Sequence, residues 1–204
     1  MNVDRARARP RETAPACARA KAWQHARMLV PGYTIRLSRR SEVGALPEIE
    51  RQANQLFASH TGDLGLRSEQ APALSSVAAL RIANDDGRLW VAADSQGQLV
   101  GFALVTELGL FAHLEELDVL PAHGRQGLGS ALLEAVCEWA YSRGFSAVTL
   151  STFRDVAWNA PFYARRGFVV IPPSELPPEL LEIVSRENQK GLRTDLRVIM
   201  QREV

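Results

Sequence analysis

Three glycines fall within six residues, at the junction between two segments of different periodicity. The segment before the junction, 113–120, alternates as a strand does, and the segment after it, 128–140, repeats apolar residues every four positions as a helix does. Gly124, Gly127 and Gly129 therefore stand in a strand-to-helix loop. Because glycine has no Cβ atom, such a loop can turn its amides toward a ligand, and the helix dipole adds positive potential there. The loop predicts a site for a phosphate or pyrophosphate group.

Two familiar nucleotide-binding loops do not match this segment. The dinucleotide fingerprint would place its third glycine at Leu132, and no Gly-Lys-Ser/Thr follows as in a Walker loop. A loop whose glycines only form a tight turn stays open as an alternative at this point.

The remaining elements predict a mixed sheet. Strands 89–93 and 99–106 have the spacing of a hairpin, whereas strand, helix and strand from 113 to 151 form a unit whose two strands are parallel. The chain is therefore predicted to be α/β, of the α+β type, with a mixed, mostly antiparallel central sheet and helices on both faces. Further strands are expected at 33–37, 168–171 and 196–201, and helices at 41–58 with Ser41 as its cap, 73–84, 128–143, 159–166 and 179–190.

Length and composition suit one domain. With 204 residues, 46% hydrophobic and 23% charged, the chain is not collagen-like, coiled-coil or wholly disordered. Residues 1–30 are expected to form a flexible Arg/Ala-rich leader before a single domain at 31–204, and a start site read upstream of Met28 would give the same pattern. No apolar run reaches the roughly 20 residues that cross a bilayer, and no signal-peptide pattern is present, so a cytoplasmic protein is expected.

Charge and cysteine content narrow the partners. Residues 31–204 hold 17 basic and 21 acidic residues, a net charge of −4 against +1 for the whole chain. Residues 31–204 therefore lack the basic face that nucleic-acid binding requires, and nucleic acid is not an expected partner. A small or cationic partner is expected instead. Cys17 and Cys137 lie too far apart in sequence to indicate a disulfide framework or a metal site, and no metal is predicted.

A second cluster of chemistry-bearing residues follows within 153–168. Asn159 and Tyr163 stand four residues apart on a short predicted helix, so their side chains can share one face. An asparagine that caps the helix and a tyrosine that packs against it would explain the spacing equally well.

Together and in this order, the two segments resemble the GNAT-type N-acetyltransferase superfamily, well over 89–168 and loosely over 33–204. The resemblance implies the GNAT, or acyl-CoA N-acyltransferase, fold, in which a parallel strand pair splays apart. In that family the loop before the long helix grips the pyrophosphate of acetyl-CoA with Gln or Arg, two residues, Gly, one residue, then Gly or Ala. Gly127 and Gly129 fit, while Gly124 takes the first position and Arg125 follows it.

The resemblance also implies residue roles. The residues implied to bind the cofactor acetyl-CoA, which is the acetyl donor, are Leu117, Val119, Gly124, Arg125, Gln126, Gly127, Leu128, Gly129, Ser130 and Asn159. Tyr163 matches the tyrosine beside the thioester sulfur, where it would protonate the departing CoA thiolate.

His113 and Glu115 are the candidates for the general base. Period-two alternation places them on the strand face shared with Leu117 and Val119. Either side chain would take the proton of the amine directly or through water, and the choice between them stays open. A structural histidine at a strand end and an exposed glutamate are the alternative.

The predicted function is transfer of an acetyl group from acetyl-CoA to a primary amine of a small molecule or peptide, by direct attack in a ternary complex. Cys137 is expected in the core rather than as a nucleophile. Glu107 and the acidic body favour a cationic acceptor, whereas Arg154 would suit an acceptor with a carboxylate. A non-catalytic acyl-CoA-binding regulatory module is the alternative; no membrane partner is expected, and a homodimer is left open.

Overall fold

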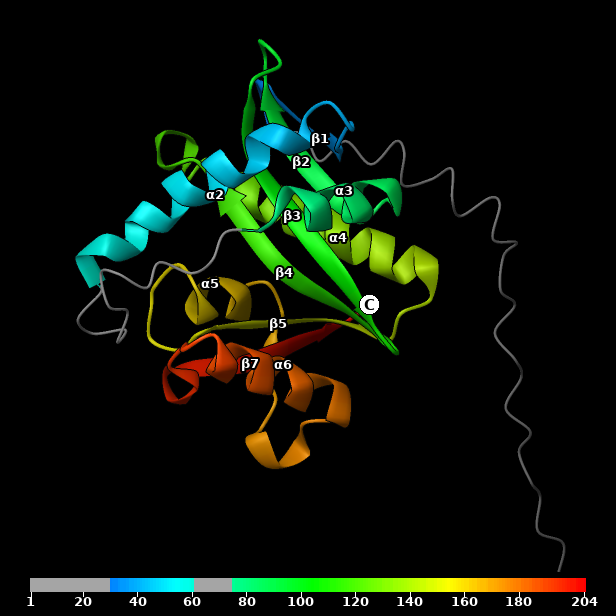
Figure 1. Cartoon of the computed structure of the whole chain (residues 1–204), viewed down its shortest axis with the longest axis vertical. Helices are drawn as coiled ribbons and strands as arrows, with labels where there is room; N and C mark the ends of the chain where they lie inside the picture. The colour runs from blue at the N-terminus through cyan, green and yellow to red at the C-terminus, as the bar shows by residue number, and fades with distance from the viewer. Residues whose placement is uncertain (1–29, 61–74) are drawn as a thin grey trace, which may run out of the picture.

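The computed structural model describes residues 30–60 and 75–204 of the 204-residue chain. These residues form a seven-stranded sheet in the order β1-β2-β3-β4-β5-β7-β6, flanked by helices (Figure 1). The strands are β1 Tyr33–Leu37, β2 Leu89–Asp94, β3 Leu99–Leu108, β4 Phe111–Val119, β5 Ala147–Phe153, β6 Val169–Val170 and β7 Arg197–Glu203. The helices are α2 Leu46–Asn54, α3 Val77–Asp85, α4 Leu128–Arg143, α5 Ala160–Ala164 and α6 Pro178–Gln189, with short 3-10 segments η2 Val43–Ala45, η3 Gln55–His60, η4 Pro121–His123, η5 Pro173–Glu175 and η6 Thr194–Leu196.

Every neighbouring strand pair of this sheet is antiparallel except β4 and β5, which are parallel. The predicted mixed, mostly antiparallel sheet is therefore confirmed. The β4–β5 register runs only from Phe111 opposite Ala147 to Leu114 opposite Leu150, although β4 continues to Val119. The two strands therefore separate beyond Leu114, as the splayed pair of the predicted fold does, and a gap opens in the sheet.

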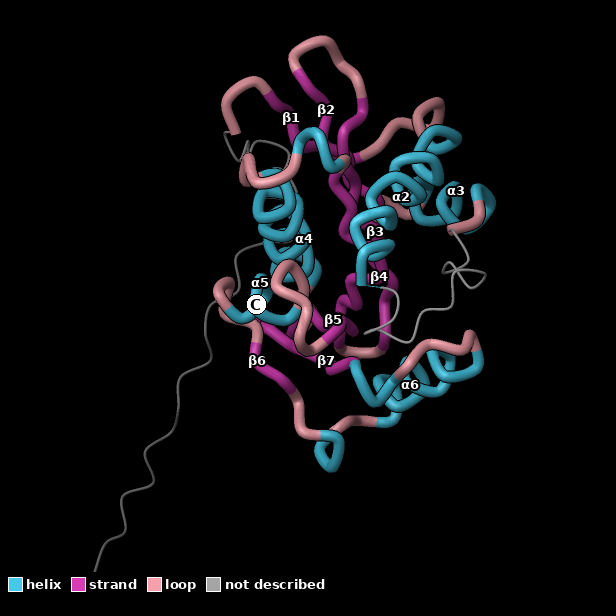
Figure 2. Tube along the Cα trace, turned by 90° about the vertical axis from the view of Figure 1, so that its left-hand side faces the viewer, coloured by secondary structure: helices cyan, strands magenta, loops and turns pink. Residues whose placement is uncertain are grey.

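Helices cover both faces of the sheet. Figure 2 shows α4 and α5 on one side of the strands and α2, α3 and α6 on the other. Helix α4 contributes Leu132 and Val136 to a core that it shares with Val105 and Leu114. On the opposite face, α2 and α3 enclose Phe102 in a second core, and α6 forms a third, smaller one. The gap between β4 and β5 therefore lies between two differently covered faces.

The predicted helix boundaries agree best with the structure where a glycine ends the helix. Helix α4 spans 128–143 as predicted and ends at Gly144, whose φ of 83° is the left-handed conformation that glycine adopts without steric cost. The predicted cap at Ser41 is wrong, because the helix predicted at 41–58 is divided into η2, α2 and η3, and α2 begins after Ala45 with a proline in its first turn. Helix α3 begins after Ser76, whose Oγ accepts from the Ala79 amide at 3.2 Å.

Two predictions concern residues that the structure does not describe. The predicted leader, apart from residue 30, and residues 73–74 of the helix expected at 73–84 lie outside the described residues. The division of the chain into a leader and one domain at 31–204 stays a prediction.

Candidate active site

A bulge in β4 decides which of its side chains share a face. His113 lies opposite Thr106 of β3 and Leu117 lies opposite Ala103, with a shift of register between these pairs. Thr106 and Ala103 are three residues apart on β3, so they face opposite sides of the sheet. Their partners His113 and Leu117 therefore face opposite sides as well.

The prediction that His113 and Glu115 share a face with Leu117 and Val119 is therefore wrong. Glu115 is the residue that the bulge leaves without a partner on β3, and period-two alternation cannot reveal such an insertion. The Glu115 carboxylate lies 3.8 Å from the guanidinium of Arg186 on α6. Leu117 and Val119 instead pack against the core under α4.

His113 is enclosed by its neighbours. The side chain is 2% exposed, and its Nδ1 lies 2.9 Å from the hydroxyl of Thr149 on β5. Burial lowers the pKa of its imidazole to about 4, so the ring is neutral at pH 7. These contacts match the structural alternative for this histidine better than an open position at the gap.

The glycine loop at the end of β4 has the backbone that its sequence predicts. Gly127, with φ of 90°, precedes the first turn of α4, and no side chain caps that end of the helix. Arg125, with φ of 57°, is the one non-glycine residue with positive φ among the described residues. The amides of the first turn, from Leu128 to Ser130, therefore have no side-chain acceptor from a capping residue. Because the Leu128 side chain is buried, it offers a ligand only its main chain.

Side chains from distant elements hold this loop in place. The Tyr33 hydroxyl donates to Gln126 Oε1 at 3.0 Å and lies 2.9 Å from His123 Nδ1. At the other end, the Arg166 guanidinium donates to the hydroxyl of Ser130, from Nε at 2.8 Å and also from Nη2. Gln126 and Ser130 thus already have protein partners, which leaves the loop amides as its main free donors.

Asn159 presents a buried donor that lacks a partner. Its Oδ1 accepts from the Thr152 hydroxyl at 2.9 Å, and this bond fixes the orientation of the amide. Its Nδ2 is buried and makes no hydrogen bond within the described part of the chain. A buried N–H group without an acceptor is costly, so this position fits a ligand that brings a carbonyl oxygen.

Tyr163 lies at the same end of the gap. Its buried ring packs edge-on against Phe162 and Phe168, and its hydroxyl has no hydrogen-bond partner among the described residues. Burial, and then the charges of Asp118 and Glu116, raise the pKa of the Tyr163 phenol. The hydroxyl is therefore protonated at physiological pH and available as a donor.

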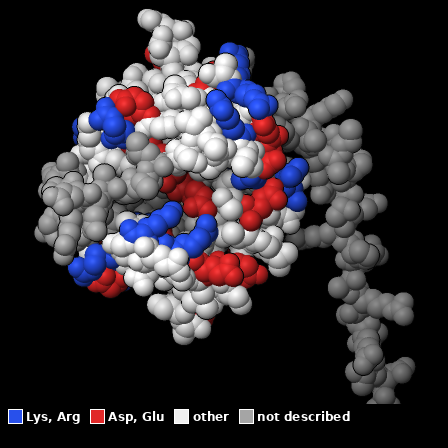
Figure 3. All heavy atoms as spheres, viewed as in Figure 1, with Lys and Arg blue, Asp and Glu red and all other residues white. Residues whose placement is uncertain are grey.

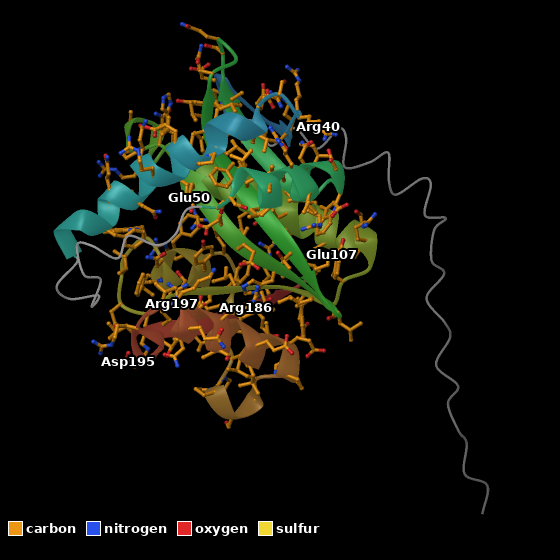
Figure 4. All side chains as sticks on the ribbon, viewed as in Figure 1. Arg40, Glu50, Glu107, Arg186, Asp195 and Arg197 are labelled. Atoms are coloured by element: carbon orange, nitrogen blue, oxygen red, sulfur yellow. The ribbon has the colours of Figure 1, made fainter. Side chains whose placement is uncertain are left out.

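Three carboxyl groups, Glu50, Glu116 and Asp118, form what we call the acidic group. Glu116 lies opposite Leu104 and Asp118 opposite Phe102, two residues of the core under α2 and α3. Glu50 comes from α2, which packs on β4 (Figure 4). Burial, and then the charge of Glu50, raise the pKa of Asp118 to about 8. In the view of Figure 3, acidic side chains lie near the middle of the molecular surface, with basic side chains directly below them.

The acidic group was missed by reasoning from sequence. Glu116 and Asp118 have the spacing of one strand face, but without the bulge they would share the face of Leu114, and only the bulge turns them toward α2. Glu50 adds a contact between segments far apart in the chain, which no local pattern predicts. Burial and Asp118 raise the pKa of Glu116 well above its usual range.

The two residues expected to choose the acceptor lie elsewhere. Glu107 is paired with Arg143 at 3.5 Å, and it sits opposite Ala112 near the start of β4, at the other end of the strand from the gap (Figure 4). The Arg154 guanidinium donates to the main-chain oxygen of Asp195 at 3.1 Å. Glu107 therefore makes no part of the acidic group.

Cys137, metal binding and membrane spans were the remaining features considered from the sequence. Cys137 is buried in the core under α4, as predicted, and burial raises the pKa of its thiol to about 12. Across residues 30–60 and 75–204, no three or more His, Cys, Asp or Glu side chains are arranged to hold a metal ion. In the same ranges, no helix has the length and apolar character needed to cross a membrane.

The sequence of the chain matches a known protein family. The sequence model of the Acetyltransferase (GNAT) family matches residues 54–168, which include the glycine loop, Asn159 and Tyr163. A streptothricin acetyltransferase of Streptomyces lavendulae is 32% identical over 85 residues, which are 41% of this chain and 45% of that protein. The match thus spans less than half of the curated relative.

Solved structures share the fold. The PaiA N-acetyltransferase of Thermoplasma acidophilum, in complex with coenzyme A, superposes with a TM-score of 0.60 at 16% identity, over 85% of this chain and 100% of that one. The N-acetylglutamate synthase of Neisseria gonorrhoeae, with coenzyme A and N-acetylglutamate, gives a TM-score of 0.60 at 19% identity, over 84% of this chain and 35% of that one. The splayed sheet seen here is therefore the fold of these proteins.

Proposed function

Because the chain belongs to the GNAT acetyltransferase family, we propose that it transfers an acetyl group from acetyl-CoA to a primary amine of a small molecule or peptide. The observation that carries this proposal is the buried, unpartnered Nδ2 of Asn159 beside the gap between β4 and β5. A donor in that position suits a carbonyl oxygen of the pantetheine arm. The same gap begins next to a loop whose free amides suit its pyrophosphate.

Acetyl-CoA would bind mainly through the backbone. In this proposal the amides of 125–130 and the dipole of α4 hold the pyrophosphate, with Arg125 close to the charge, while the Gly124 amide donates to the Pro121 oxygen at 3.1 Å. The main chains of Leu117 and Val119 pair with the pantetheine arm, because β4 has no strand neighbour on that side beyond Leu114. Asn159 completes the contact from the β5 side.

The transfer itself is a direct displacement. The nitrogen of the neutral amine attacks the thioester carbonyl carbon, and a main-chain amide near Val119 stabilises the oxyanion that forms. As the carbon–sulfur bond breaks, the sulfur takes the proton of the Tyr163 hydroxyl, and CoA leaves as the thiol. The amine proton passes to a base, so no acyl-enzyme is formed and Cys137 has no role.

A base is needed because the acceptor is mostly protonated. Removing a proton from an amine of pKa about 10 at pH 7 costs about 4 kcal/mol. We propose that Glu116 accepts this proton directly, because it lies on the α2 face of β4, just beyond the point where β4 and β5 separate, and is only partly buried. His113 and Glu115, the two candidates named from the sequence, would act through water, since the first is enclosed and the second is paired with Arg186.

The experiment is a thiol-release assay of the full chain with acetyl-CoA over a panel of primary amines, with mass analysis of the products. We expect free CoA and an N-acetylated amine in equal amounts, and no acetylated protein. Tight CoA binding without thiol release from any amine would support the non-catalytic CoA-binding module instead. An acetylated cysteine formed on the pathway would contradict direct transfer.

A further inference from the structure

Among the described residues, the acidic group has no ion-pair partner of its own. None of its three carboxyl groups takes part in an ion pair within the described ranges, although other carboxylates there are paired, such as Glu134 with Arg202 at 2.6 Å. Glu50 is 1% exposed and accepts from the Ser75 amide, at 2.9 and 3.2 Å, and from the Ser75 side chain. Lys190 and Arg197 act on the group only through longer-range charge interactions.

Asp118 shows that the group is incomplete by itself. The residue is 9% exposed, and its Oδ2 is buried without a hydrogen-bond partner among the described residues. It lies on the β4 face that Glu50 approaches from α2, and its carboxyl is close enough to Glu50 for the two charges to interact. A buried carboxyl oxygen without a partner costs free energy, and adjacent carboxyls make ionisation still more costly. A bound cation would remove both penalties.

The missing cation is organic rather than a metal ion. The three carboxyls do not converge as ligands do around a metal, within the residues that the structure describes. An alkylammonium group is larger and donates three hydrogen bonds, so it can be shared between oxygens that a metal could not reach together. It would also stand next to the gap where the proposed acetyl transfer takes place.

We propose that Asp118 and Glu50 hold a second ammonium group of the acceptor, so that the acceptor is an aliphatic diamine or polyamine. The amine that is acetylated lies at the gap beside Glu116 and Tyr163, and the alkyl chain spans the distance to Asp118. This inference rests on the proposed acetyl transfer. It excludes acceptors whose carboxylate would lie near the acetylated amine, such as an α-amino acid, because that charge would meet the acidic group.

The test compares two acceptors that differ in one ammonium group. The ratio of kcat/KM for putrescine, a four-carbon diamine, to that for butylamine is measured in the full chain. One charge-assisted hydrogen-bonded contact is expected to give a preference of about 10- to 100-fold for the diamine. Asp118→Asn and Glu50→Gln keep the shape of each side chain and should each reduce this ratio several-fold or more.

Glu107→Gln is the matched control. It removes a carboxylate at the other end of β4, and the ratio should stay within about twofold of the unchanged chain. Thermal melting and CoA affinity show whether each variant is folded. Equal use of the diamine and the monoamine, or a preference that survives both Asp118→Asn and Glu50→Gln in folded protein, overturns the proposal.

A failure of the acetyl transfer itself gives a different result. In that case no amine releases thiol, and calorimetric titration of the CoA-loaded chain with putrescine decides the subsite by itself. Putrescine binding that Asp118→Asn weakens and Glu107→Gln does not would support the subsite, and no binding of putrescine would contradict it.

Discussion

The two sides of the gap in the sheet are built on different principles. On the α4 side, the glycine loop offers main-chain amides, and the side chains around it are apolar or already paired. On the α2 side, the acidic group offers carboxyl oxygens that are buried at Glu50 and Asp118, and one of them, Asp118 Oδ2, has no partner among the described residues. A site made of main-chain amides binds the phosphates and carbonyl groups of a ligand, whatever the ligand carries elsewhere. A site made of carboxyl groups, by contrast, selects ligands that are positively charged. In the proposed function, the first side binds the acetyl donor and the second side selects the acceptor.

The largest expected effect lies where the two sides meet, at Tyr163. Tyr163→Phe keeps the ring and its packing on Phe162 and Phe168 but removes the hydroxyl. We expect turnover to fall about 10²- to 10⁴-fold, the usual range for loss of a general acid. CoA affinity and the melting temperature should change little. Tyr141→Phe, at an exposed position of α4, is the control. Turnover within about threefold of the unchanged chain, with chemistry rate-limiting, would reduce Tyr163 to a packing residue.

A loss of about 100-fold or more in turnover is expected for Glu116→Gln at neutral pH. The loss should shrink as pH rises, because the free amine then accumulates without a base. The measurement is the pH profile of kcat/KM for Glu116→Gln, Glu115→Gln and His113→Asn, each compared with the unchanged chain. A pH-dependent loss in Glu115→Gln or His113→Asn, with none in Glu116→Gln, would assign the base to the residues named from the sequence.

On the α4 side alone, Gly127→Val should weaken CoA binding by roughly 100-fold. A valine is strained at φ of 90°, at a cost of about 1–3 kcal/mol, and its side chain would stand where the backbone approaches the pyrophosphate. Gly124→Ala is the comparison: its φ of −64° suits any residue, and the added Cβ would need only a small local shift, because it would lie 3.2 Å from the main-chain oxygen of Pro121. Calorimetry that finds unchanged CoA affinity in folded Gly127→Val would show that the glycine loop does not bind CoA.

A further expected effect is on stability, and it belongs to the α2 side. Asp118 has an ordinary pKa of 3.8 that folding raises to about 8, so the folded chain holds a proton that the unfolded chain has released. The free energy of unfolding therefore falls as pH rises from about 4 to 8, by at most about 1.4 kcal/mol per pH unit for this group. Asp118→Asn should flatten the decline, and Glu107→Gln should not. A pH dependence that is identical in all three chains would place Asp118 in contact with solvent.

The two sides also differ in how much of them a sequence reveals. The glycine loop, α4 and the parallel pair β4–β5 follow from glycine spacing, a four-residue repeat and the crossover rule, all of which act locally. Asn159 and Tyr163 could be selected only because their order after the loop resembles a known family. Their individual roles stay predictions.

The acidic group depends on features that a local pattern does not contain. The bulge at Glu115 inverts the pattern of faces for the rest of β4, so Glu116 and Asp118 turn toward α2. Glu50 reaches them from 66 residues earlier than Glu116, by the packing of α2 on β4. The sequence shows many carboxylates, and only this packing distinguishes the three that lie together, two of them, Glu50 and Asp118, buried.

The measurement that tests the account most directly is a crossed titration of Gly127→Val and Asp118→Asn. CoA is titrated into each chain, and putrescine is then titrated at a CoA concentration that saturates that chain. We predict that Gly127→Val loses affinity for CoA by roughly 100-fold and binds putrescine within about threefold of the unchanged chain. Asp118→Asn should bind CoA within about threefold of the unchanged chain and lose affinity for putrescine several-fold or more. Both variants losing the same ligand, or neither losing any, would contradict a gap with a donor side and an acceptor side.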